Sequence, residues 1–73
     1  MGGLLEKLLL QYKWIDGDVE VLVVAVRQPS GAVETITNTT HIPEKIAYYR
    51  EVYDSDFRLK SNPEVHVIGF LLV

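Results

Sequence analysis

The side chains best suited to acid–base or nucleophilic chemistry are two histidines and a group of threonines. His41 follows a threonine-rich stretch, residues 35–40, and His66 lies much further along the chain. Nucleophilic catalysis needs a hydroxyl held against a base and an oxyanion site, whereas neighbours in an extended chain point to opposite sides. Neither histidine has a metal-binding spacing such as H-x-x-x-H. We therefore predict no catalytic site, no metal site and no cofactor.

A binding site is better indicated by the polar segment 37–41, which we expect to link a strand to a helix. Pro43 suits the first helical position because its missing N–H needs no partner there. Free backbone N–H groups and the dipole at a helix start favour an anionic or polar ligand. Nearby aromatic rings and cations offer the stacking and charge that a nucleotide-like molecule would use. The predicted ligand-binding residues are Asn38, Thr39, Thr40, His41, Tyr48, Arg50, Arg58 and Trp14.

Several of these residues also have a purely structural interpretation. His41 could be a solvated loop residue, and the cations could be solvated while Tyr49 and Tyr53 fill the core. Trp14 could anchor an interface or close the core. We interpret His66, which lies among apolar residues, as a hydrogen-bonded structural histidine.

The elements that must position these residues begin with a β-hairpin over residues 18–37. Its first strand, 19–28 (VEVLVVAVRQ), is dense in β-branched residues, the turn contains proline and glycine, and 32–37 (AVETIT) alternates as a return strand. An apolar stripe over 43–54, formed by Ile46, Tyr49 and Tyr53, predicts an amphipathic helix. The nearly unbroken apolar run 64–73 (EVHVIGFLLV) predicts a strand buried on both faces, covered by a helix, a strand or a second copy.

The N-terminal segment 1–17 has two interpretations. Leucines and Tyr12 form a helical face, but the pair Asp16-Gly17 is also a hairpin signal. We prefer a helix because both candidate strand faces of residues 8–15 mix polar and apolar side chains; the alternative is a four-stranded meander with one helix. The predicted fold class is α+β, with a small mixed sheet, a helix packed on one face and an additional N-terminal helix. Crossover packing places the last strand in the middle, parallel to a neighbour.

Length and composition limit the classes of function. The 73 residues predict a single domain without cysteine, and a core of this size supplies only about 3–5 kcal/mol. Because 48% of the residues are hydrophobic, we expect a homo-oligomer. A net charge of −3 argues against binding to duplex nucleic acid. Charged residues interrupt the N-terminal leucines, so we predict neither a signal peptide nor a membrane span, and a cytoplasmic location.

Residues 24–73, with VRQPSGAVETITNT, IPEKIAYYREVYD and FRLKSNPEVHVIGFLLV, resemble the very short open reading frames of bacteriophages that infect Gram-positive hosts. The resemblance implies a non-enzymatic inhibitor of host defence, active in the host cytoplasm. Our first hypothesis is therefore sequestration of a nucleotide-derived immune signal. The alternative is a protein–protein inhibitor or structural accessory protein that binds a host protein through exposed acidic groups. Those groups are Glu20, Glu34, Asp54, Asp56 and Glu64.

Overall fold

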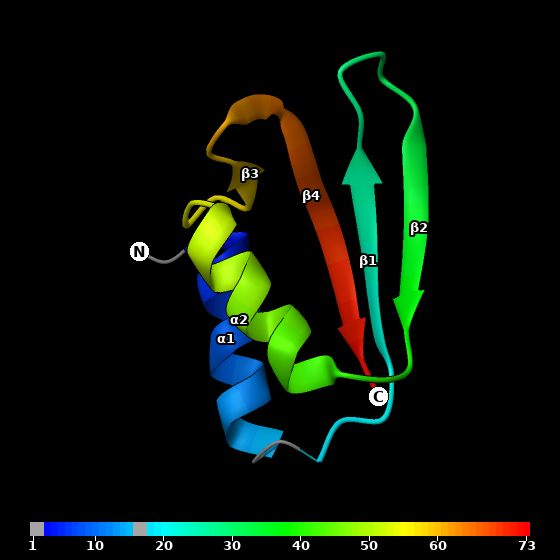
Figure 1. Cartoon of the computed structure of the whole chain (residues 1–73), viewed down its shortest axis with the longest axis vertical. Coiled ribbons are helices and arrows are strands. Elements are labelled where there is room, and N and C mark those ends of the chain that lie inside the picture. The colour runs from blue at the N-terminus through cyan, green and yellow to red at the C-terminus, as the bar shows by residue number, and fades with distance from the viewer. Residues whose placement is uncertain (1–2, 16–17) are drawn as a thin grey trace.

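Two helices cover one face of a four-stranded antiparallel β-sheet (Figure 1). The computed structural model describes residues 3–15 and 18–73. The elements in chain order are α1 (Leu4–Ile15), β1 (Leu22–Arg27), β2 (Val33–Asn38), α2 (Ile42–Val52), β3 (Arg58–Leu59) and β4 (Asn62–Leu72). The α+β class and the N-terminal helix are thus confirmed. The Asp16-Gly17 pair, which suggested a hairpin turn, lies outside the described residues.

The sheet has the strand order β2-β1-β4-β3, and every hydrogen-bonded pair is antiparallel. The last long strand does lie in the middle, but the prediction of a mixed sheet with a parallel neighbour is wrong. The reason is the position of β1. Strands β2 and β4 run in the same direction, as a β-α-β crossover requires, and β1 lies between them (Figure 1). The short strand β3 was not predicted.

The core lies between the sheet and the two helices. In β1, Leu22, Val24 and Val26 are buried beneath the helices, while the intervening residues face the other side of the sheet. Each helix contributes to the core the apolar face that its periodicity predicts. Tyr49, Tyr53 and Phe57 fill the end of the core near β3. The remaining core residues are Leu5, Leu8, Ile42, Ile46 and Val67.

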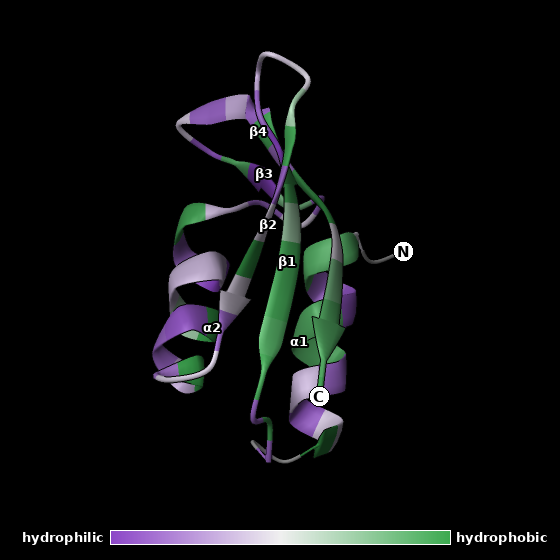
Figure 2. Ribbon diagram, turned by 90° about the vertical axis from the view of Figure 1, so that its right-hand side faces the viewer, coloured by the Kyte–Doolittle hydropathy of each residue, from purple (hydrophilic) through white to green (hydrophobic). Residues whose placement is uncertain are grey.

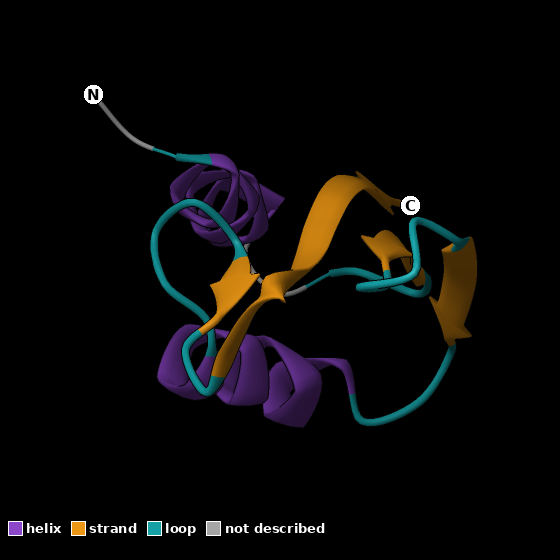
Figure 3. Cartoon of the chain, turned by 90° about the horizontal axis from the view of Figure 1, so that it is seen from above, coloured by secondary structure: helices purple, strands orange, loops and turns teal. Residues whose placement is uncertain are grey.

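No helix among the described residues covers the second face of the sheet. Figure 2 looks onto this face and shows hydrophobic residues along β1 and the C-terminal half of β4. Ile68, Leu71 and Val73 are exposed. The prediction that the final strand is buried on both faces is therefore wrong for a single copy. The cause is that α1 and α2 both pack on the same side, as the view from above also shows (Figure 3).

Helix α1 is fastened to the turn that follows α2. The N–H of Leu5 donates to the carbonyl oxygen of Ser55 at 3.2 Å. Gly3 lies so close to the same carbonyl that a Cβ atom there would clash with it. Neither helix in the described ranges has both the length and the apolar composition needed to cross a membrane.

Candidate functional site

The polar segment between β2 and α2 has the predicted position but little capacity to bind. The Nδ2 group of Asn38 donates to the backbone oxygen of Leu22 at 3.4 Å, which ties this side chain to the sheet. Thr39, Thr40 and His41 are exposed. His41 adopts a left-handed backbone conformation at the N-cap of α2, and its side chain makes no capping hydrogen bond. A helix N-terminus with one donor removed by Pro43 does not by itself constitute a site.

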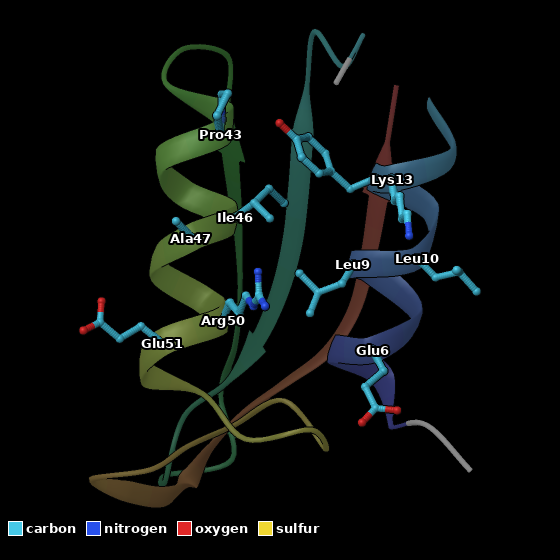
Figure 4. A pocket seen from close by; sticks show the side chains of 10 residues that line it. Glu6, Leu9, Leu10, Lys13, Pro43, Ile46, Ala47, Arg50 and Glu51 are labelled. Carbon is cyan, nitrogen blue, oxygen red and sulfur yellow. The ribbon is translucent and has the colours of Figure 1, made fainter. Parts of the chain in front are cut away.

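Tyr48 and Arg50 lie on different flanks of α2. Residues two positions apart in an α-helix are rotated by about 200° from one another. The ring of Tyr48 contacts Tyr49 and Tyr53 edge-on, and the Lys45 ammonium lies 5.7 Å from its centre. Arg50 instead points toward α1 (Figure 4). The predicted pairing of this aromatic ring with this guanidinium is therefore not formed.

The remaining predicted site residues are also scattered. A guanidinium N–H of Arg58 donates to the carbonyl of Pro63 at 3.1 Å, next to the turn before β4. Trp14 is 81% exposed near the end of α1, so it does not close the core. His66 is half-buried, and its Nε2 forms a hydrogen bond of 3.1 Å with the backbone oxygen of Asp56. This contact agrees with a structural role for His66.

A groove between the two helices is a stronger candidate site (Figure 4). Helices α1 and α2 run antiparallel, and the space between them is an open groove of about 910 Å³. Small residues on the flank of α2, Pro43 and Ala47, leave this space unfilled. The lining residues are Glu6, Leu9, Leu10, Tyr12, Lys13, Pro43, Ile46, Ala47, Arg50 and Glu51.

Of the residues predicted from the sequence, only Arg50 lines the groove. The signal that could have revealed it is the spacing of Pro43, Ala47 and Arg50, which places two small side chains and one cation along a single flank of α2. On α1, Leu9 and Leu10 extend the apolar surface beyond the buried Leu5 and Leu8. Of the residues of α1, only Trp14 was predicted to bind a ligand, and it does not line the groove.

The charges along the groove balance one another. Lys13 and Arg50 contribute two positive charges, and Glu6 and Glu51 contribute two negative ones. Arg50 extends into the groove beside Leu9, whereas Lys13 lies further along α1, and Glu51 points away (Figure 4). The groove thus has an apolar floor, and its two cationic residues, Lys13 and Arg50, are separated from each other on the rim. It does not concentrate positive charge in one place.

The polar side chains of the groove are charged residues and one tyrosine. Its lining contains no histidine, serine, threonine or cysteine. In the part of the chain that the structure describes, no three His, Asp or Glu residues are grouped as metal ligands. Burial raises the pKa of both Tyr49 and Tyr53, but these side chains lie in the core and do not line the groove. The arrangement can hold a ligand by shape, apolar contact and a single guanidinium.

Comparison with known protein families, curated sequences and solved structures finds no significant match to this chain. The assignment of the site therefore depends on its geometry and chemistry.

Proposed function

We propose that this chain is a non-enzymatic binding protein whose α1–α2 groove receives one amphipathic helix of a partner protein. The observation that carries the proposal is the groove itself, which is open, apolar on its floor and bordered by two antiparallel helices. A third helix placed between two others buries its apolar face in such a groove. Leu10, exposed at the rim, would be covered by the same partner.

The length of the groove suits two turns of a helix. Residues 6 and 13 of α1, which mark its ends, are separated by about 10 Å along the helix axis. A partner helix presents apolar anchors at positions i, i+3 or i+4, and i+7 over the same length. The side chains available to receive these anchors are Leu9, Ile46 and Ala47.

Arg50 supplies the polar part of the recognition. Its guanidinium reaches into the groove, where an acidic residue of the partner helix could accept a bidentate hydrogen bond. The separation of Arg50 from Lys13 and the acidic neighbours on the rim favour this ligand over a nucleotide-derived one. Phosphate groups carry concentrated negative charge and would need several cations together. The protein-binding hypothesis therefore has more support than sequestration of a nucleotide signal.

A displayed library of helical peptides, randomised at one face, tests the proposal. We expect the selected peptides to share apolar residues at i, i+3 or i+4 and i+7 with one acidic position. The variant Ala47→Trp fills the groove and should weaken a selected peptide at least tenfold by fluorescence polarisation. Lys45→Trp places the same side chain on another flank of α2 and should leave the affinity unchanged, because Lys45 does not line the groove.

Two outcomes would contradict this proposal. One is equal binding of the selected peptides to the Ala47→Trp and unchanged chains, with circular dichroism showing that both are folded. The other is calorimetric binding of ADP-ribose or a cyclic dinucleotide that Ala47→Trp abolishes, since the groove would then belong to a small molecule. Charge reversal in Arg50→Glu should weaken peptides with an acidic position and strengthen those with lysine there.

A further inference from the structure

Strand β4 pairs with β3 along its first half and with β1 along its second half, and the two ladders overlap only at His66. On one edge it pairs with β1 as far as Leu72. On the other edge, the pairing with β3 extends only to His66, and one further bond joins the N–H of Val67 to the backbone oxygen of Phe57 at 2.9 Å. Beyond Val67, no strand among the described residues covers this edge.

The hydrogen-bond pattern shows which backbone groups are open. Val21 and Val73 exchange two bonds, at 3.2 and 3.0 Å, and therefore form a hydrogen-bonded pair. Such pairs alternate along an antiparallel ladder. The N–H and C=O groups of Phe70 and Leu72 must then point away from β1, towards the uncovered edge. Within the described ranges, none of these four groups has a backbone partner.

This open edge lacks the charged residues and proline that commonly protect a strand edge against association. Exposed edges in natural proteins are blunted by charges, proline or a very short strand. Residues 65–73 (VHVIGFLLV) contain no proline, lysine, arginine, aspartate or glutamate. The opposite edge of the sheet belongs to β2, a shorter strand with exposed Glu34. Of the two outer edges, the one at β4 is therefore the edge suited to pairing.

We propose that β4 pairs antiparallel with β4 of a second copy of this chain, about a two-fold axis that passes through Leu71. In this register, Phe70 lies opposite Leu72 of the second copy, and Leu72 lies opposite its Phe70. Each of these two pairs exchanges two hydrogen bonds, so all the open groups are satisfied. An edge that meets its own copy about a two-fold axis is complementary to itself, which favours a second copy over an unrelated strand.

The register next to this one is less favourable. A two-fold axis at Phe70 would pair Leu72 with Ile68 of the second copy, and Ile68 lies in the bulge that interrupts the ladder between Gly69 and Val67. The axis at Leu71 instead pairs regular strand residues on both copies.

Side chains on the open face support the same register. Leu71, which is 57% exposed, meets Leu71 of the second copy across the axis. Val73, which is 63% exposed, lies across from Gly69 of the second copy. In the single chain, a Cβ atom added at Gly69 would have no other atom within 4 Å, and the backbone φ of Gly69 does not require glycine. The fold of one copy therefore does not explain the glycine. A glycine within a strand commonly marks a bulge or a close approach of another chain. Gly69 lies next to the bulge at Ile68, and in the proposed dimer it faces the second copy.

Amide hydrogen exchange followed by NMR tests the pairing in the unmodified protein. We expect the amides of Phe70 and Leu72 to become protected as the concentration rises, because they bond only to the second copy. The Val73 amide, which donates to Val21 within one chain, should be protected at every concentration. Exchange at Phe70 and Leu72 that stays as fast as in an unpaired strand up to about 1 mM would overturn the proposal.

A matched pair of variants gives an independent test by light scattering. Leu71→Lys places two ammonium groups against each other at the axis and should raise the dissociation constant of the dimer at least tenfold. Val33→Lys changes a residue of similar exposure, 55%, on β2 and should leave the mass of the assembly unchanged. A monomeric mass for the unmodified protein, or equal loss of the dimer in both variants, would overturn the pairing. If Leu71→Lys does not fold, the exchange measurement decides.

Discussion

His41 begins α2 with φ 53° and ψ 38°, in the left-handed region that most side chains avoid. For a residue with a Cβ atom this conformation costs about 1–2 kcal/mol. The imidazole makes no capping hydrogen bond that would offset the cost. The left-handed backbone of His41 therefore turns the chain between β2 and α2. We interpret His41 as a turn residue and not as a ligand-binding residue.

Substitution at this position should separate backbone strain from side-chain chemistry. We expect His41→Gly to leave the free energy of unfolding unchanged or to raise it by up to about 1 kcal/mol, because glycine adopts this conformation without strain. His41→Val should lower it by about 1–2 kcal/mol. Urea denaturation measures both. Thr39→Gly is the control: Thr39 has no positive φ, so glycine there should only destabilise.

Phe57 also has a positive φ, 66°, and its side chain is fully buried. The preceding turn supports it, because one carboxylate oxygen of Asp54 accepts the N–H groups of Asp56 and Arg58, both at 3.0 Å. The Asp54 side chain thus accepts hydrogen bonds within the turn, a common role of aspartate at such positions. The turn places Phe57 against Tyr49 and Tyr53.

At the scale of elements, the end of α2 and the turn before β3 share an aromatic cluster. Tyr49, Tyr53 and Phe57 lie edge-on to one another with ring centres 5.5 Å apart. Burial is the main cause that raises the pKa of both tyrosines above their ordinary value. The neighbouring tyrosines raise it further, and a hydrogen bond with the Asn38 side chain lowers that of Tyr49.

This cluster should make stability fall at high pH. The folded chain binds the phenol protons more tightly than the unfolded chain, whose tyrosines titrate near pH 10. The stabilisation is therefore complete below about pH 10 and is lost as the pH rises through the raised pKa values. Urea midpoints between about pH 8 and 11 measure this decrease. The double variant Tyr49→Phe/Tyr53→Phe should lose most of it, and an equal decrease in both proteins would contradict the assignment.

For the molecule as a whole, the two proposed surfaces are distinct. The groove lies between the helices, and the open strand edge belongs to the sheet. A single core of this size supplies limited stability, so pairing through β4 should add to it. Failure of the peptide-binding experiment would leave the proposed β4 dimer unaffected. A monomeric protein would likewise leave the proposed binding of a helix in the groove unaffected.

The thermal midpoint of the unmodified protein should therefore rise with protein concentration. Association that occurs only in the folded state stabilises that state by mass action. Calorimetry over a hundredfold range of concentration measures the shift. In Leu71→Lys the midpoint should be independent of concentration, whereas Val33→Lys should behave like the unmodified chain. A constant midpoint for all three proteins would contradict the proposed dimer.

Local patterns in the sequence determined most of the elements. The hairpin, α1 and the core stripe of α2 each depend on periodicities of two or 3.6 residues that can be seen within a short segment. Helical geometry alone also separates Tyr48 from Arg50 once α2 is predicted, and the predicted ligand site overlooked this. The tertiary structure decided that β1 lies between β2 and β4 and that both helices share one face of the sheet. Those outcomes depend on packing between residues far apart in the chain, which no short pattern records, and they create the groove beside Arg50 and the uncovered edge of β4.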